Sequence, residues 1–157
     1  MISMPKEEIK DLTKFLKPFP AEVKEIALWL REFVWDIYPD SNELIYDNYN
    51  ALAFGWSITD KLGDVFCNIA VGRTTNNIHF GFYWGSKIAD PEKKLIGQGN
   101  QYRYMLVKNQ KEFPKSYIKK LLKEAYAYST GKMKKPKEDV KGMTITKSIS
   151  EKKRRKQ

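Results

Sequence analysis

The sequence predicts an α+β fold in which an antiparallel sheet of about four to five strands packs against N-terminal and C-terminal helices. Apolar residues repeat with helical spacing near both ends of residues 1–131 and alternate with a period of two between them. Short polar turns separate the alternating segments, which is typical of an antiparallel meander. The order of helix, strands and helix therefore favours helices packed on one face of a single sheet.

The first long helix is expected over residues 22–38. Its apolar residues fall on one face, at the spacing of an amphipathic helix: Val23, Ile26, Ala27, Leu30, Val34 and Ile37. Pro39 and the turn-forming residues after it end this helix. A short helix over residues 7–15 is expected to precede it, and a last helix should open at Pro114 and stop near Gly131.

Four strands are expected, over residues 51–57, 65–71, 78–84 and 101–107. Cys67 shares the apolar face of the second strand, so it is interpreted as a buried small hydrophobe instead of a nucleophile. The single histidine, His79, alternates with the apolar residues of the third strand. It should therefore point to the wetter side of the sheet, as a surface side chain.

The length and the distribution of charge predict one domain followed by a tail. A chain of 157 residues suits a single core. Residues 132–157 hold 11 Lys or Arg and three acidic residues, a balance of +8 within the net charge of +10. We expect a disordered basic tail there and a folded domain over residues 1–131. The single cysteine and the lack of a long apolar run favour a cytoplasmic location.

One flank of the first long helix is acidic. Four carboxylates fall within a stripe about 80° wide at 100° per residue: Glu22, Glu25, Glu32 and Asp36. Oxygen ligands suit hard cations such as calcium, magnesium and iron, so the stripe is a candidate site for a cation of this kind. The alternative is the ordinary polar face of an amphipathic helix. Trp29 lies inside the stripe, and a surface that docks protein partners is predicted around Trp29 and Trp35.

A glycine-rich loop precedes the fourth strand. Gly97, Gly99 and Arg103 could cradle an anion through backbone N–H groups and the guanidinium. The loop matches neither the phosphate-loop nor the dinucleotide fingerprint, and a tight turn before a strand explains the glycines equally well. An enzyme acting on a small anion near Arg103 is one alternative function, although the sequence offers no identifiable general base or nucleophile.

The segment 151–156 of the tail is strongly basic, and it supports a further alternative. Such a segment could bind nucleic acid or an acidic membrane electrostatically, with an affinity that falls steeply with salt, and the alternative function is that of a nonspecific nucleic-acid accessory protein. No aromatic residues interleave with it, so binding would be nonspecific. A tail that only solvates the chain is the competing interpretation.

Over residues 22–130 the chain resembles the YdhG-like family, small bacterial domains of largely unknown function. The resemblance rests on the aromatic-glycine strand Phe80–Gly85, the Asp-Pro turn at Asp90, a Leu-x-Gly-x-Gly loop, and Arg103 opening the next strand. Some members are described as frataxin-like iron chaperones. The resemblance implies a helix–sheet–helix sandwich similar to frataxin, in a non-enzymatic binding protein without an obligatory cofactor. It also implies that iron is held weakly by surface acids on the first helix and first strand, and the acidic stripe of the first long helix is the place for that role in this chain.

Overall fold

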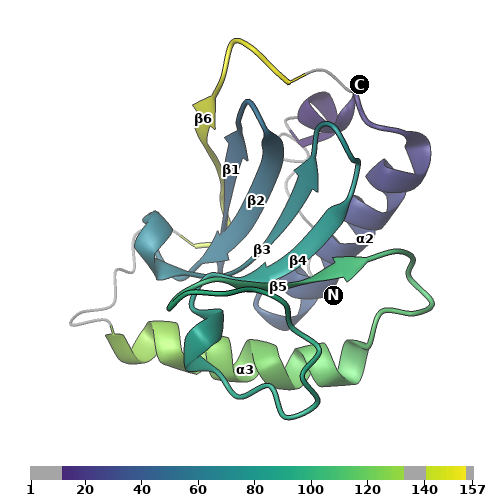
Figure 1. Ribbon diagram of the computed structural model, residues 1–157. Coiled ribbons are helices and arrows are strands. Elements are labelled where there is room, and N and C mark those ends of the chain that lie inside the picture. The colour runs from purple at the N-terminus through teal and green to yellow at the C-terminus, as the bar shows by residue number, and fades with distance from the viewer. Residues whose placement is uncertain (1–11, 133–140, 155–157) are drawn as a thin grey trace.

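The structure is a computed structural model that describes residues 12–132 and 141–154, and it shows helices on one face of one sheet (Figure 1). The six strands lie in the order β5-β4-β3-β2-β1-β6. The elements are α2 (Ala21–Ile37), β1 (Asn42–Asp47), β2 (Ala51–Ser57), β3 (Val65–Gly72), β4 (Ile78–Phe82), β5 (Arg103–Val107), α3 (Lys115–Lys132) and β6 (Thr144–Ile149). Residues 12–16 are also helical. The predicted α+β class is confirmed.

The strands form a meander with one added parallel strand. From β1 to β5, each strand pairs antiparallel with the next. After β5 the chain passes through α3 and returns as β6, which pairs with β1 in parallel (Figure 1). The sheet is therefore mixed and has six strands, where the sequence predicted four to five antiparallel ones.

The strands β1 and β6 were not predicted. Residues 144–149 belong to the segment expected to be a disordered tail, and that prediction is wrong for β6. Without β6, β1 would be an edge strand with a row of unpaired backbone groups, and pairing satisfies them. The rest of that predicted tail, residues 133–140 and 155–157, lies outside the described residues, as do residues 7–11 of the first predicted helix.

The helix α2 forms where the apolar periodicity predicted it. Val23, Ala27, Leu30 and Val34 follow one another at spacings of three and four, and all four are buried against the sheet. The helix ends one residue before Tyr38, whose backbone N–H donates to the Val34 carbonyl at 3.0 Å. The proline that follows cannot continue the helix.

Aromatic rings fill the space between the sheet and the helices. Phe80 of β4 packs edge-on against Phe33 of α2, with ring centroids 6.5 Å apart, and against Phe113 before α3, at 5.5 Å. Edge-to-face pairs of this kind add stabilisation beyond the area that they bury. Cys67 lies in the same core, fully buried, as the sequence predicted.

A buried ion pair ties α2 to β1 and β6. Arg31 and Glu43 are 1% and 0% exposed. The arginine Nε donates to Oε2 of the glutamate at 2.8 Å, and Nη2 donates to Oε1 at 2.7 Å. The Thr144 hydroxyl of β6 donates to the same Oε1 at 2.8 Å. The guanidinium also lies 5.0 Å from the centre of the Trp35 ring. One carboxylate therefore connects three elements.

Glu43→Gln keeps the shape of this side chain but removes the charge opposite Arg31. We expect the free energy of unfolding to fall by about 3–5 kcal/mol, because a buried arginine loses its counter-ion. Urea unfolding followed by tryptophan fluorescence measures the change.

Glu92→Gln is the matched control. Glu92 Oε1 lies 3.8 Å from Lys94 Nζ, and the two side chains are 58% and 41% exposed. Removing one partner of such a pair costs about 0–1 kcal/mol. Equal losses in the two variants would contradict the role given to the buried pair.

Candidate functional site

The face of the sheet that turns away from α2 and α3 has small side chains at its centre. Leu44, Gly55, Asn68, Gly81 and Tyr104 lie side by side across five strands. Glycines flank Asn68 on both neighbouring strands, so neither of its partners in that row carries a side chain. The register therefore leaves a hollow on this face.

A β-bulge aims the residues of β3 at this hollow. The register between β2 and β3 shifts between Trp56 and Ser57. As a result, Phe66 and Cys67 both lie in the core, whereas Val65 and Asn68 line the outer face. Bulges commonly redirect side chains in this way near functional sites.

Tyr102 lies across the sheet at Gly81. A Cβ atom at position 81 would collide with the hydroxyl and ring carbons of Tyr102, so only glycine lets the ring rest on the strand. The Tyr102 ring stacks on Tyr104 with centroids 5.8 Å apart, and Tyr104 stacks on His79 at 4.3 Å. His79 is half-buried on this outer face, where the sequence placed it.

The hollow has a volume of about 390 Å³. Small side chains, three tyrosines and three amides line it: Tyr46, Asn48, Ala53, Gly55, Leu62, Val65, Asn68, Tyr83, Gln101 and Tyr102. No charged residue is among them. The volume lies in the range of small-molecule sites, which combine apolar walls with a few convergent polar groups.

Two polar groups determine which hydrogen bonds the hollow can offer a ligand. The Oδ1 atom of Asn68 is buried and has no hydrogen-bond partner among the described residues. Burial raises the pKa of Tyr102 to about 12, against the opposing effect of its hydrogen bond with Asn68. Tyr102 is therefore a neutral phenol at physiological pH. A buried acceptor without a partner carries a desolvation cost that a ligand donor would relieve.

The cysteine and the histidine, which are suited to covalent or acid–base chemistry, are not among the residues that line the hollow. Cys67 faces the core, where burial raises the pKa of its thiol well above the usual value. His79 stacks on Tyr104, and burial lowers its pKa. The hollow therefore offers binding groups, and among the described residues that line it there is no thiol, imidazole or carboxylate.

The four acids proposed as iron ligands lie exposed along α2: Glu22, Glu25, Glu32 and Asp36. In the part of the chain that the structure describes, no three His, Cys, Asp or Glu side chains come together in a way that would hold a metal ion. Carboxylates spread along a helix at 1.5 Å per residue do not converge on one ion. Weak iron binding on α2 stays a prediction.

The predicted anion loop is formed as a tight turn around Arg103. Gly97 and Gly99 have φ angles of +137° and +88°, which favour glycine. The guanidinium donates to the carbonyl oxygens of Gln98, Gly99 and Tyr102, at 3.3, 2.7 and 2.8 Å. The arginine thus holds the loop together, and an anion would have to compete with these carbonyls. Anion binding at this loop stays a prediction.

The partner surface predicted around Trp29 and Trp35 has to be corrected. Trp35 is 5% exposed, and its indole N–H donates to the Ser41 carbonyl at 2.8 Å. It lies inside because the helix turn that carries Arg31 faces the sheet, not solvent. Trp29 is half-buried against Phe33 and the segment before α3. The two tryptophans therefore do not form one exposed surface.

No family model matches this chain, and comparison with curated proteins and with solved structures found no match either. The resemblance to the YdhG-like family accordingly stays a prediction. None of the described helices combines the length and the apolar composition that crossing a bilayer requires.

One pattern in the sequence indicates the hollow. In residues 51–56 small residues alternate strictly with large apolar ones, which places Ala53 and Gly55 together on the side away from the core. That pattern indicates a strand with a hollow outer face. It does not reveal Tyr46, Tyr83 and Tyr102, because their convergence depends on the pairing of other strands.

The raised pKa of Tyr102 makes stability depend on pH. An unfolded tyrosine ionises near pH 10, whereas the folded one stays protonated up to about 12. The contribution of the phenol is therefore complete below pH 10 and is lost as the pH rises through 12. Relative to Tyr102→Phe, we expect the wild type to lose about 2–3 kcal/mol across this interval.

Urea unfolding at a series of pH values measures this difference. Tyr49→Phe, at an exposed tyrosine, is the matched control and should follow the wild-type profile. Parallel profiles for wild type and Tyr102→Phe would contradict the burial of this phenol.

Proposed function

We propose that this chain is a non-enzymatic binding protein that holds a small, uncharged, planar ligand in its tyrosine-lined hollow. The observation that carries the proposal is Asn68 Oδ1, a buried acceptor without a partner among the described residues, set between two glycines on the sheet. A ligand N–H or O–H placed over Asn68 would satisfy it.

The side chains that line the hollow favour a flat ligand. Tyr46, Tyr83 and Tyr102 present rigid rings that pack well against flat surfaces. Ala53 has a small side chain and Gly55 has none, so a flat molecule can approach the sheet closely at these positions. These features together favour an aromatic or heteroaromatic body with a polar edge.

The residues that line the hollow also favour an uncharged ligand. Its polar groups are the amides of Asn48, Asn68 and Gln101 and the tyrosine hydroxyls, all of them neutral. A charged ligand would lose hydration without gaining a counter-ion, which is costly in a partly buried site. An uncharged ligand avoids this cost.

The frataxin-like iron role uses a different surface, the exposed acids of α2, and the two activities can be tested separately. The hollow has the stronger support because its polar groups converge, whereas the α2 carboxylates lie spread along a helix. An anaerobic ferrous-iron titration followed by residue-resolved NMR addresses the iron role, and broadening confined to residues 22–36 would support it.

Benzamide and two relatives test the ligand class. Benzamide is planar, neutral and has an N–H donor, benzoate carries a charge, and cyclohexanecarboxamide is not planar. We expect benzamide to shift the side-chain amide NMR signals of Asn48, Asn68 and Gln101, and the other two compounds to shift them less at equal concentration. Shifts spread over the whole surface, or the same response to all three compounds, would overturn the proposal.

Filling the hollow should abolish this response. Ala53→Leu places a larger side chain on the floor, and we expect benzamide affinity to fall at least tenfold, about 1.4 kcal/mol. Ala127→Leu makes the same change at an exposed position on α3, and it should bind like the wild type. Equal affinities for the two variants would place the ligand elsewhere.

A further inference from the structure

A second pocket lies apart from the hollow, where the C-terminal segment meets the start of α2. Its volume is about 400 Å³. Three segments far apart in the sequence line it: Pro18, Phe19 and Pro20 before α2, Arg73 and Asn76 after β3, and Lys153 and Arg154 after β6. Neither the predicted iron site nor the predicted anion loop includes these residues.

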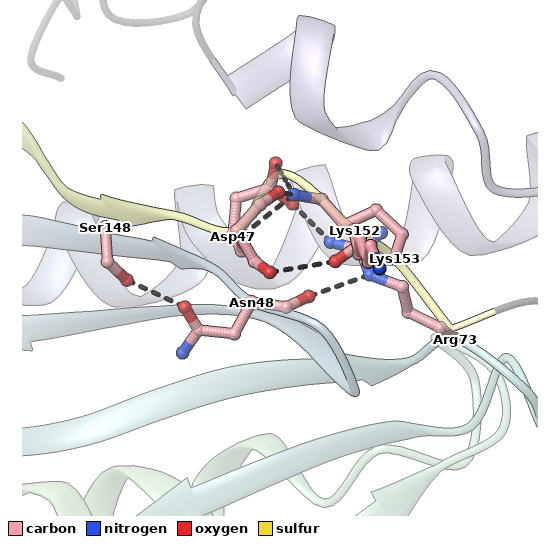
Figure 2. Close-up of polar contacts among 7 residues, drawn as sticks. Asp47, Asn48, Arg73, Ser148, Lys152 and Lys153 are labelled. Atoms are coloured by element: carbon pink, nitrogen blue, oxygen red, sulfur yellow. Dashed lines mark hydrogen bonds and ion pairs between the residues drawn. The ribbon is translucent and has the colours of Figure 1, made fainter.

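Arg73 is the buried cation of this pocket. It is 7% exposed, and its Nε donates to the Asn48 carbonyl at 2.9 Å. Its Nη2 pairs with Oδ1 of Asp47 (Figure 2). Its guanidinium lies 5.5 Å from the centre of the Phe19 ring. Hydrogen bonds and ring packing therefore fix the guanidinium at the pocket wall.

The C-terminal segment contributes two more cations. Lys153 Nζ lies 3.3 Å from Oδ2 of Asp47, on the other side of the same carboxylate (Figure 2). The backbone N–H of Arg154 donates to the Tyr49 carbonyl at 2.9 Å, and its side chain donates to Asn50 Oδ1 at 3.4 Å. The strand β6 thus delivers both side chains to defined positions.

The charges at this pocket do not balance. Three cations line the pocket and one carboxylate, Asp47, pairs with two of them, which leaves +2; no acidic residue is among the described lining residues. Pro20 lines the pocket and immediately precedes the 17-residue helix α2, which has no side-chain cap at this end. Glu22 in the first turn of α2 already complements the positive end of the helix dipole, so the basic side chains are the source of the attraction for an anion.

We propose that this pocket binds the phosphoryl group of a small molecule. The guanidinium groups of Arg73 and Arg154 supply the donors that phosphate oxygens accept, and the Lys153 ammonium, which already contacts Asp47 and the Ser150 carbonyl, adds positive charge. The volume exceeds that of a phosphate group, and the remaining wall is formed by Phe19 and two prolines. A phosphate ester with an apolar body fits these walls, and free inorganic phosphate shares the same charged contacts.

Phenyl phosphate, inorganic phosphate and phenol are the probes, titrated into the full chain at low salt by calorimetry and NMR. We expect phenyl phosphate to bind tightest and to shift the Nε–H signal of Arg73, which is buried and therefore observable. Inorganic phosphate with the same shift and equal affinity would assign the site to the free anion. Phenol bound as tightly as phenyl phosphate, or no saturable binding of either phosphate compound, would overturn the proposal.

Charge-matched variants separate a site from general attraction. Lys153→Gln with Arg154→Gln should weaken phenyl phosphate binding at least tenfold. Lys119→Gln with Lys120→Gln removes the same charge from an exposed face of α3 and should leave it within twofold. Equal weakening in both double variants would overturn the proposal.

The single variant Arg154→Gln tests whether weaker binding comes from the lost side chain and not from a disrupted β6. Arg154→Gln removes an exposed side chain while the backbone bond to Tyr49 remains. We expect it to weaken phenyl phosphate binding several-fold without changing the urea midpoint. Unchanged binding would remove Arg154 from the site and contradict the proposal.

Discussion

The ion pair between Arg31 and Glu43 is the interaction on which the arrangement of this sheet depends. A carboxylate on the helix-facing side of a strand is tolerated only when its hydrogen bonds are satisfied, and Arg31 and Thr144 satisfy them. Thr144 lies opposite Glu43 in the parallel pairing of β1 and β6. A slip of one residue would turn Thr144 to the other face. The buried charge therefore specifies the register of the last strand.

The alternation of large and small residues along β2 gives the two faces of the sheet their different character. In β2, Leu52, Phe54 and Trp56 point to the helices, and Ala53 and Gly55 point away. Dense packing on one side supplies the stability of the fold, since buried apolar area is its main favourable contribution. The outer face of the sheet does not pack against the helices. A hollow with an unpaired amide oxygen can therefore persist on that face.

Periodicity was enough to predict α2, α3 and the alternating strands, because each buries a regular apolar face. It was not enough for β1. The inward positions of that strand are Glu43, Ile45 and Asp47, so charge interrupts the apolar pattern. The arginines that compensate these acids lie 12 and 26 residues away in the sequence. A local pattern cannot show such partners.

The candidate sites were harder to predict for a related reason. The hollow depends on the bulge in β3 and on the placement of Tyr102 over Gly81, and both are consequences of strand pairing. Composition alone could identify the basic segment, although it suggested a disordered tail. The positions of the basic side chains depend on β6, which carried too weak an apolar pattern to be predicted.

The net charge of +10 takes on a different meaning once β6 is in place. Sequence alone attributed most of the excess to a solvated tail, where charge acts only over distance and is screened by salt. Glu43 and Asp47, both inward on β1, bond to Thr144 and Lys153 respectively. They hold the C-terminal segment at the start of β6 and after its end, so part of its charge is fixed against the body of the protein. Fixed cations beside an aromatic wall can discriminate between anions, which a solvated tail cannot do.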